Sequence, residues 1–308
     1  MVKNMKVLGI GESVIDNAKM LNSERVEKHV GGPSLIALIL LSRLGVDCTL
    51  LTTLGRDEEA RIIKKTLKHE SIEMIAGLQQ RTKINTYLIN PKNGSRQKVR
   101  GNVIHPDIAN LDRNFIRKFD LIIIDRHEHT AFYEILKMKK LSTKILIDPS
   151  TEVSPFTMDM IKHADYPIIP IEALVKIGNG NNLVLCLEAL RRLTKNPIII
   201  TAGELGSIIY NGKTIELIPS LHVKVTDVQG AGDIYRGAFA YGIIQKWDNK
   251  KCAEYANTVA ALHCTKLGNA AAVPRKEEIN TLNNFILQKR QITMPEINKR
   301  FFGLEEVL

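Results

Sequence analysis

Leu121-Ile122-Ile123-Ile124 is a run of four large aliphatic residues with no polar residue among them. A strand that is covered on both faces, as in a parallel sheet, has this continuous apolar pattern, whereas a strand with one wet face alternates. Comparable β-rich runs recur at 6–10, 49–53, 145–147 and 198–201. These runs predict the strands of a mostly parallel central sheet.

Helical patterns lie between the runs, at 34–44, 58–70, 130–140 and 183–195. Strands and helices that alternate at this length are typical of a doubly wound α/β fold, with helices flanking the sheet. The last third of the chain changes character, because two hairpin-like strands are followed by several helices. We predict those strands at 207–210 and 214–218 and the helices at about 231–246, 250–266 and 275–288.

Two segments depart from this alternation, at about 12–30 and 80–104. Both alternate polar and apolar residues, and the second reads as a hairpin of 84–89 and 96–99 around a turn at 91–94. We predict antiparallel ribbons that cover a cleft as a small β lid. Because no repeat or flexible linker divides the chain, 1–308 is predicted to be a single domain with these lid segments inserted.

The composition is that of an ordinary globular protein, with 308 residues, 44% apolar and 25% charged. The four cysteines form no CxxC pair, which argues against a zinc ribbon or a secreted disulfide framework. The longest apolar run, 35–41, is far shorter than the roughly 20 residues that span a bilayer. We therefore expect a cytoplasmic protein without a membrane partner.

The net charge is 43 − 33 = +10. Basic residues are scattered in ones and twos, and the 16 aromatic residues are not interleaved with them as in nucleic-acid binding proteins. We therefore expect no nucleic-acid partner, while the positive balance suits a small ligand that carries phosphates.

The most informative motif is Val225-Thr226-Asp227-Val228-Gln229-Gly230-Ala231-Gly232-Asp233, immediately before a helical pattern. A glycine-rich turn at a helix start directs unpaired N–H groups and the helix dipole at one spot, which suits a phosphoryl group. A carboxylate there could accept a proton from an attacking hydroxyl. The alternative is a glycine loop whose Asp233 only complements the helix dipole.

Other motifs stand in a fixed order around this one: Gly31-Gly32-Pro33-Ser34, Leu54-Gly55-Arg56-Asp57, Thr201-Ala202-Gly203-Glu204-Leu205-Gly206, Ala256-Asn257 and Pro274-Arg275. In order and spacing, over nearly the whole chain, they resemble the ribokinase-like (PfkB) carbohydrate kinase family. The resemblance implies a sheet flanked by helices, a small β lid, and transfer of the γ-phosphoryl of ATP, with Mg²⁺, to a hydroxyl of a sugar or sugar-like molecule.

The resemblance also implies roles for the residues of the later motif. Asp233 would act as the general base, and the backbone of Gly230, Ala231 and Gly232 would form the anion hole. Asp227, with carbonyls of the Cys264 to Ala272 region, resembles the monovalent-cation site of some family members, which suggests K⁺.

For the substrate, the resemblance places Asp16 against hydroxyl groups and lets a sugar approach the backbone of Gly31 and Gly32. The alternatives are that Asp16 lies in a lid turn and that the glycines only start a helix. On the nucleotide side, the resemblance implies Thr201, Gly203, Gly206 and Asn257. The alternative for Asn257 is an internally hydrogen-bonded helix residue.

The chain departs from the family pattern at several positions. Ile36 and Val228 stand where an asparagine and a threonine are usual. The family's Asn-x-x-Glu motif should fall near 169–174, where only Glu172 offers a carboxylate, which would contact Mg²⁺ through water. The loss of the amide at position 36 means that the substrate is less polar there or is held otherwise.

Arg126 follows the apolar run at 121–124 and should lie at the carboxyl edge of the sheet, where ligands of α/β proteins bind. It is a candidate for substrate binding, and the alternative is a surface pair with Asp125 or Glu128. His127 and His129 have no third ligand at a telling spacing, so we predict no transition metal there.

The sequence therefore predicts an ATP-dependent carbohydrate kinase. One alternative is a nucleoside kinase of the same fold, which Ile36 slightly favours. Another is a catalytically weak sugar- or nucleotide-binding regulatory protein, for which the altered region around Glu172 is the support. Exposed lid edges could pair two copies in a homodimer.

Overall fold

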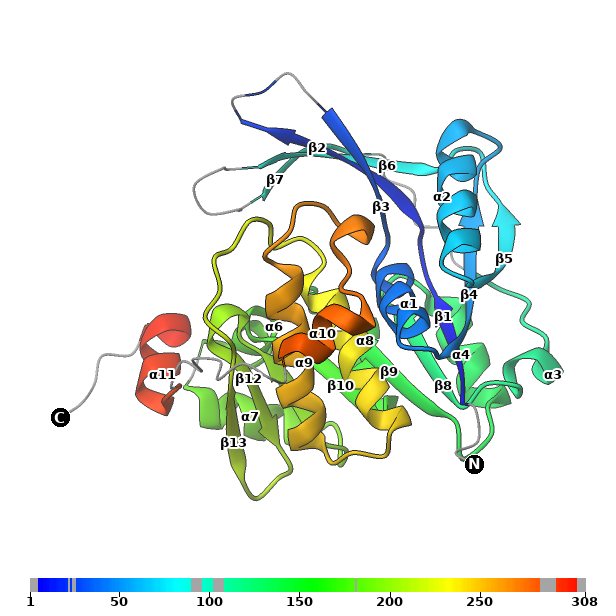
Figure 1. Ribbon diagram of the computed structural model, residues 1–308. Helices are drawn as coiled ribbons and strands as arrows, with labels where there is room; N and C mark the ends of the chain where they lie inside the picture. The colour runs from blue at the N-terminus through cyan, green and yellow to red at the C-terminus, as the bar shows by residue number, and fades with distance from the viewer. Residues whose placement is uncertain are drawn as a thin grey trace.

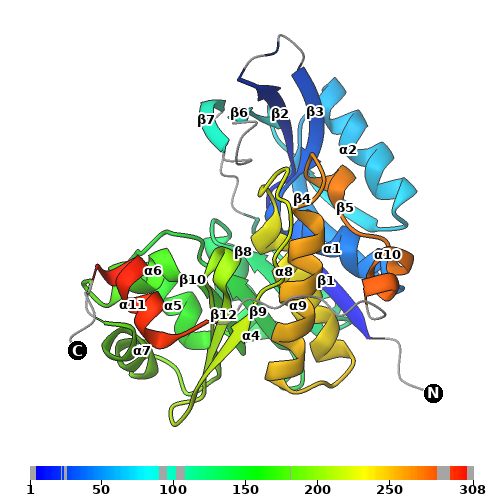
Figure 2. The same cartoon turned by 60° about the vertical axis from the view of Figure 1, so that its left-hand side comes forward.

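The structure is a computed structural model, and it describes residues 5–303 except 22, 24–25, 90–95, 102–107, 181 and 283–291. These residues form a nine-stranded sheet with helices on both faces, and a four-stranded sheet that stands at one end of it (Figures 1 and 2). The arrangement confirms the predicted α/β fold with a mostly parallel sheet and a second, small β element.

The large sheet has the strand order β13-β12-β11-β10-β9-β8-β1-β4-β5. The pairs from β11 through β5 are parallel, and only β12 and β13 run antiparallel to their neighbours. The strands are β1 Lys6–Ile10, β4 Asp47–Leu54, β5 Glu73–Leu78, β8 Leu121–Asp125, β9 Lys144–Asp148, β10 Tyr166–Pro170, β11 Ile198–Thr201, β12 Gly206–Tyr210 and β13 Ile215–Pro219.

Alternate residues of these strands enter two separate apolar cores, one on each face of the sheet. Val7 and Ile123 belong to the first core, and their neighbours Leu8 and Ile122 belong to the second. Successive side chains of a strand point to opposite faces, so a strand that is buried on both faces needs apolar residues at every position. This is the physical reason for the continuous apolar runs.

The helices divide between the two cores in the same way. Residues of α1, α2, α8, α9 and α10 pack in the first core, and residues of α3 to α7 and α11 pack in the second. The helices are α1 Pro33–Arg43, α2 Glu58–His69, α3 Arg113–Ile116, α4 His129–Met138, α5 Pro155–His163, α6 Ile171–Ile177, α7 Leu183–Arg191, α8 Ala231–Ile244, α9 Asn249–His263, α10 Lys276–Leu282 and α11 Met294–Phe302, with short 3₁₀ turns at Gly203–Leu205 and Ala270–Ala272.

The small sheet has the order β3-β2-β6-β7 and is made of β2 Val14–Met20, β3 Val26–Gly31, β6 Lys83–Ile89 and β7 Arg96–Gly101. These strands fall in the two segments that the sequence set apart. The predicted antiparallel ribbons are confirmed, because β2 pairs with β3 and β6 pairs with β7 in antiparallel fashion. The two ribbons are joined by a parallel pairing of β2 with β6, which the sequence did not predict. A parallel pair needs a long crossover, and here the chain between β2 and β6 contains β3, then α1, β4, α2 and β5.

A buried ion pair ties the small sheet to the end of β1. Lys83 begins β6, and its ammonium lies 2.6 Å from the Glu12 carboxylate, which follows β1. Both side chains are largely buried, with 7% and 17% exposure. The contact fixes the base of the small sheet next to the carboxyl ends of β1 and β8.

Several elements were absent from the sequence prediction. The strand β5 is mostly exposed at the sheet edge, and β10 carries prolines at both ends of its core, so neither shows a long apolar run. The helices α5, α6 and α11 are short and were also missed. The predicted turn at 91–94 and the end of the predicted 275–288 helix lie outside the described residues. Among the described helices, none is long and apolar enough to cross a membrane.

Candidate active site

The N-terminal glycine pair lies where β3 ends and α1 begins. Gly32 has a φ of 127°, and a Cβ atom there would lie 2.2 Å from the Glu12 carbonyl oxygen. A Cβ atom on Gly31 would lie 2.5 Å from the Asp16 carboxylate. Both positions therefore require glycine, because the chain passes too close to its neighbours for any side chain. Gly31 places the backbone directly against Asp16.

The second glycine motif begins α8. Gly230 is the residue before the helix and has a φ of 80°, and a Cβ atom there would lie 2.3 Å from the side-chain oxygen of Asn269. Ala231 and Gly232 form the first turn, whose N–H groups have no partners within the helix. The N-terminus of this 14-residue helix is therefore suited to hold a phosphoryl group.

Asp16 joins the two motifs in space. It lies in β2 rather than in a turn, so the lid-turn interpretation is wrong, and it is 2% exposed. Three side-chain amides donate to its carboxylate: Asn85 to Oδ1 at 3.0 Å, Asn269 to Oδ2 at 3.4 Å, and Gln229 to Oδ2. The small sheet supplies Asp16 and Asn85, whereas Gln229 and Asn269 come from loops around α8 and α9.

Asp233 occupies the first turn of α8 beside a buried arginine. Arg236, three residues later in the same helix, is the largest fully buried side chain in the part of the chain that the structure describes. Its Nη2 lies 3.3 Å from Asp233 and 3.4 Å from Asp125 at the end of β8. Asp125 also accepts a 2.7 Å hydrogen bond from the Ser34 hydroxyl of α1. No role was predicted for Arg236 from the sequence, although its i,i+3 spacing from Asp233 is a signal that could have identified it.

Burial raises the pKa of Asp233 to about 7. The Arg236 guanidinium acts in the opposite direction, while the nearby carboxylates of Asp148, Asp125 and Asp16 raise this pKa further. Burial also raises the pKa of Asp125, to about 6. The Asp233 side chain keeps 20% exposure, so it remains reachable from solvent. A carboxyl group with a pKa near 7 is well matched to accept a proton at neutral pH.

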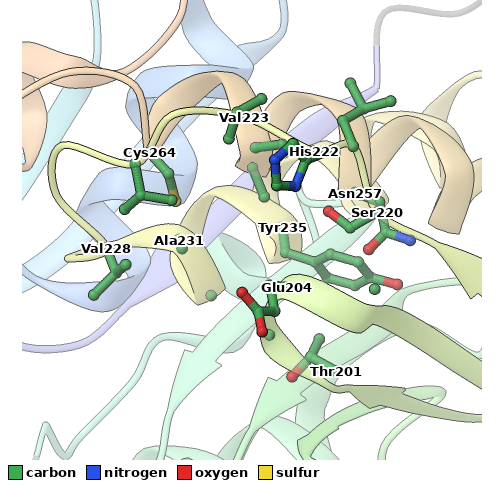
Figure 3. Close-up of a pocket in the computed structure, with 17 residues that line it drawn as sticks. Thr201, Glu204, Ser220, His222, Val223, Val228, Ala231, Tyr235, Asn257 and Cys264 are labelled. Carbon is green, nitrogen blue, oxygen red and sulfur yellow. The ribbon is translucent and has the colours of Figure 1, made fainter. Parts of the chain in front are cut away.

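A pocket of about 300 Å³ opens next to the start of α8 (Figure 3). Its lining includes all four residues that were predicted on the nucleotide side, together with two residues of the predicted anion hole. These six are Thr201, Gly203, Gly206, Asn257, Ala231 and Gly232. Figure 3 shows the ring of Tyr235 of α8 below Ser220 and Asn257 at the wall of the pocket. The structure thus brings the separate motifs together in one cavity.

Asn257 lines this pocket but is also fully engaged within the protein. Its side-chain amide donates to the Ile218 carbonyl at 2.9 Å and to the Ser207 hydroxyl at 3.1 Å, and the residue is 4% exposed. These contacts tie α9 to β12 and β13. These hydrogen bonds match the alternative that Asn257 is an internally hydrogen-bonded helix residue. Asn257 nevertheless lines the pocket.

Arg126 does not form either of the two ion pairs considered from sequence. Its partner is Glu152, at 3.6 Å, because Asp125 is taken by Arg236 and Ser34. The Arg126 side chain is 29% exposed. Glu172 lies in the first turn of α6 and is exposed. The substrate role of Arg126 and the metal role of Glu172 stay predictions.

Asp227 is fully buried beside the second motif. Its carboxylate accepts the N–H of Gly268 at 2.9 Å and that of Gln229 at 3.1 Å. The Cys264 carbonyl, within the region predicted to surround a cation, accepts the N–H groups of Thr226 and Asp227. Among the residues that the structure describes, no group of three His, Cys, Asp or Glu side chains is placed to hold a metal ion. The monovalent-cation role of Asp227 stays a prediction.

Sequence reasoning missed most of the side chains around the two aspartates. Asn85, Gln229 and Asn269 contact Asp16, and Asp148 lies near Asp233. Asp148 ends a short buried strand, so its place at the carboxyl edge of the sheet could have been inferred. The three amides have no such signal, because they come from distant parts of the chain.

The chain belongs to the pfkB family of carbohydrate kinases, whose family model matches residues 4–276. This confirms the resemblance that the motifs carry.

Relatives and solved structures agree with this assignment. A ribokinase from Lactococcus lactis subsp. lactis (strain IL1403) is 30% identical over 166 residues, which are 53% of this chain and 54% of that protein. A 5-dehydro-2-deoxygluconokinase from Clostridium tetani is 24% identical and covers 94% of this chain and 95% of that protein.

Two solved structures show the same fold. The Thermotoga maritima ribokinase superposes with a TM-score of 0.78 at 18% identity, covering 91% of this chain and 100% of that one. A Vibrio cholerae fructokinase bound to fructose, ADP and a calcium ion has a TM-score of 0.76 at 18% identity, covering 90% and 98%.

Proposed function

We propose that this protein transfers the γ-phosphoryl group of ATP to a hydroxyl group of a sugar or sugar-like molecule. The observation that carries the proposal is the start of α8. There the N–H groups of the first turn, which have no partner within the helix, border a pocket of about 300 Å³, and a carboxyl group with a pKa of about 7 stands beside them. These are an anion-stabilising group and a proton acceptor, the two parts that phosphoryl transfer to an alcohol needs.

In this proposal, different residues bind the nucleotide, accept the proton and stabilise the transferred phosphoryl group. The pocket lined by Thr201, Gly206 and Asn257 takes the nucleotide, with its phosphates toward Ala231 and Gly232. Asp233 accepts the hydroxyl proton, and the first-turn N–H groups stabilise charge on the transferred group. The buried Arg236 guanidinium offsets the negative charge of Asp233 and Asp125.

Asp16 and the backbone at Gly31 orient the acceptor. The small sheet, which carries Asp16, would cover the acceptor as a lid and exclude water. Two copies could pair through the edges of that sheet.

Mg²⁺ is expected with the nucleotide, where it would shield phosphate charge during transfer. The described residues form no three-ligand metal cage, which fits an ion that keeps waters and phosphate ligands. Support for a nucleotide with a divalent ion comes from the fructokinase relative, which was solved with ADP and calcium. K⁺ near Asp227 is part of the same proposal.

The decisive experiment measures ADP release from ATP and Mg²⁺, with and without K⁺, over a panel of sugars, polyols, sugar phosphates and nucleosides. Acceptor-dependent ADP from a sugar or polyol supports the proposal, and activity confined to nucleosides selects the nucleoside kinase instead. If ligands bind but no acceptor raises ADP above background, the protein is a binding protein and the proposal fails.

A further inference from the structure

The three amides around Asp16 share a feature that their hydrogen bonds to Asp16 do not explain. An ionised carboxylate only accepts hydrogen bonds, so each amide must turn its NH₂ group toward Asp16 and its carbonyl oxygen away. The carbonyl oxygens of Asn85, Gln229 and Asn269 are all buried, and none of the three has a hydrogen-bond partner in the structure. Buried polar atoms without partners are rare and costly, and three at one place indicate a missing ligand.

The three amides lie between the small sheet and the start of α8. Asn85 and Asn269 are 5% and 2% exposed, and Asn269 Oδ1 lies against Gly230 at the start of α8. Gln229 immediately precedes Gly230 and is only partly buried. The cluster therefore lies between the lid residue Asp16 and the anion hole, where an acceptor must present its hydroxyl group.

The same cluster bears on position 36, where Ile36 stands in place of the asparagine that is usual in the family. Ile36 is fully buried in the apolar core of α1, so it contributes nothing to a polar site. Gln229 and Asn269 bring side-chain amides to Asp16 from the other end of the chain. Side-chain amides therefore reach Asp16 even though position 36 offers none.

We propose that Gln229, Asn269 and Asn85 are the groups that select the acceptor, and that they require adjacent hydroxyl groups on it. One carboxylate and three carbonyl oxygens offer acceptors only, so the ligand must supply donors there. A vicinal diol supplies two donors at neighbouring positions. A deoxy or O-methyl analogue leaves carbonyl oxygens unpaired and is rejected for that reason. This inference rests on the proposed function, since it names the acceptor for Asp233.

Gln229 is the residue through which to test the proposal. Its backbone N–H and carbonyl bind Asp227 and His263, and a side-chain substitution keeps both contacts. Gln229→Met preserves length and removes the amide. Gln245→Met makes the same change at an exposed position at the other end of α8 and serves as the matched control.

The experiment compares three pairs of acceptors: ribose with 2-deoxyribose, glucose with 2-deoxyglucose, and inosine with 2′-deoxyinosine. For the pair that the wild type uses best, we expect a preference for the diol that falls about tenfold in Gln229→Met. The loss should be in KM for the acceptor, with kcat and KM for ATP within about twofold of wild type. Gln245→Met should match the wild type.

Two kinetic outcomes overturn the inference. One is an unchanged diol preference in Gln229→Met, and the other is an equal loss of kcat on both members of a pair, which would indicate a structural role. If the wild type turns over none of the pairs, calorimetric titration of the same compounds decides the inference, and the proposed function is judged separately on the full acceptor panel. Binding with a Gln229-dependent diol preference supports it, and absence of binding or of that preference overturns it.

Discussion

The side chains of Asp16 and Gln229, 213 positions apart in the sequence, are hydrogen-bonded to each other across the boundary between the small sheet and the start of α8. The contact links the residue that is proposed to orient the acceptor to the loop that is proposed to hold the phosphoryl group. Substitutions on either side should therefore affect acceptor binding and transfer in distinguishable ways.

Asp233→Asn should abolish most of the transfer while leaving nucleotide binding intact. The substitution keeps the size of the side chain and removes the proton acceptor, so kcat should fall roughly a hundredfold or more. Steady-state ADP release gives kcat, and calorimetry gives the Kd for ATP. Asp47→Asn, at the exposed start of β4, is the control that should leave both unchanged. A variant that keeps more than about a tenth of wild-type kcat, a cost below ~1.4 kcal/mol, is incompatible with this role.

The pH dependence of kcat/KM should have a rising limb near pH 7. The pKa of Asp233 is raised to about 7, and a general base acts only when it is deprotonated, so activity is lost as pH falls through this value. The Arg236 guanidinium lowers that pKa, so Arg236→Gln should move the limb to higher pH, whereas Arg236→Lys should keep it nearer the wild type. A limb that stays in place in Arg236→Gln would show that Asp233 does not set the profile.

Gly230→Ala should destabilise the protein more than Gly45→Ala does. Both residues have a φ near +80°, so each variant incurs about 1–2 kcal/mol of backbone strain. Only at position 230 does the new methyl group meet an obstacle, the Asn269 side chain at 2.3 Å, because nothing lies within 4 Å of a Cβ atom at Gly45. Urea unfolding measures the difference, which we expect on the order of 1–3 kcal/mol. Equal free energies of unfolding would mean that Asn269 moves away without cost.

Asn257→Ala should reduce the free energy of unfolding by about 1–3 kcal/mol, since the Ile218 carbonyl and the Ser207 hydroxyl lose their buried donor. Lys250→Ala, at an exposed position of the same helix, should have little effect. Thermal or urea unfolding should be measured together with KM for ATP. A raised KM with unchanged stability would favour the nucleotide contact over the structural role.

Much of the large sheet was accessible from sequence because its strands are buried on both faces. Alternate residues of the run Leu121-Ile122-Ile123-Ile124 pack in the two cores on opposite faces of the sheet. A continuous apolar run of this kind is needed only in a strand that is buried on both faces. The strand β5 was not accessible, since most of its residues are exposed and its pattern carries no burial signal. The parallel pairing of β2 with β6 was also missed, because local patterns do not reveal which distant strand is the partner.

For the candidate site, the sequence indicated the backbone features better than the side-chain contacts. Gly32 and Gly230 have positive φ angles and stand at helix starts, as their motifs predicted. The contacts of Asn269 with Asp16 and of Arg236 with Asp125 join positions more than a hundred residues apart. Such pairs are set by tertiary packing, which a single sequence does not display.

The parallel pairing of β2 with β6 has a consequence for how the chain acquires its site. The segment between these strands includes β4 and β5 of the large sheet, and the helices α1 and α2. The pairing of β2 with β6 therefore closes a loop that spans from Val14 to Lys83. Contacts so distant in sequence form late, after the entropy of closing the loop has been compensated by packing within it. The elements that recognise the acceptor should therefore be the last part of the N-terminal half to become ordered during refolding.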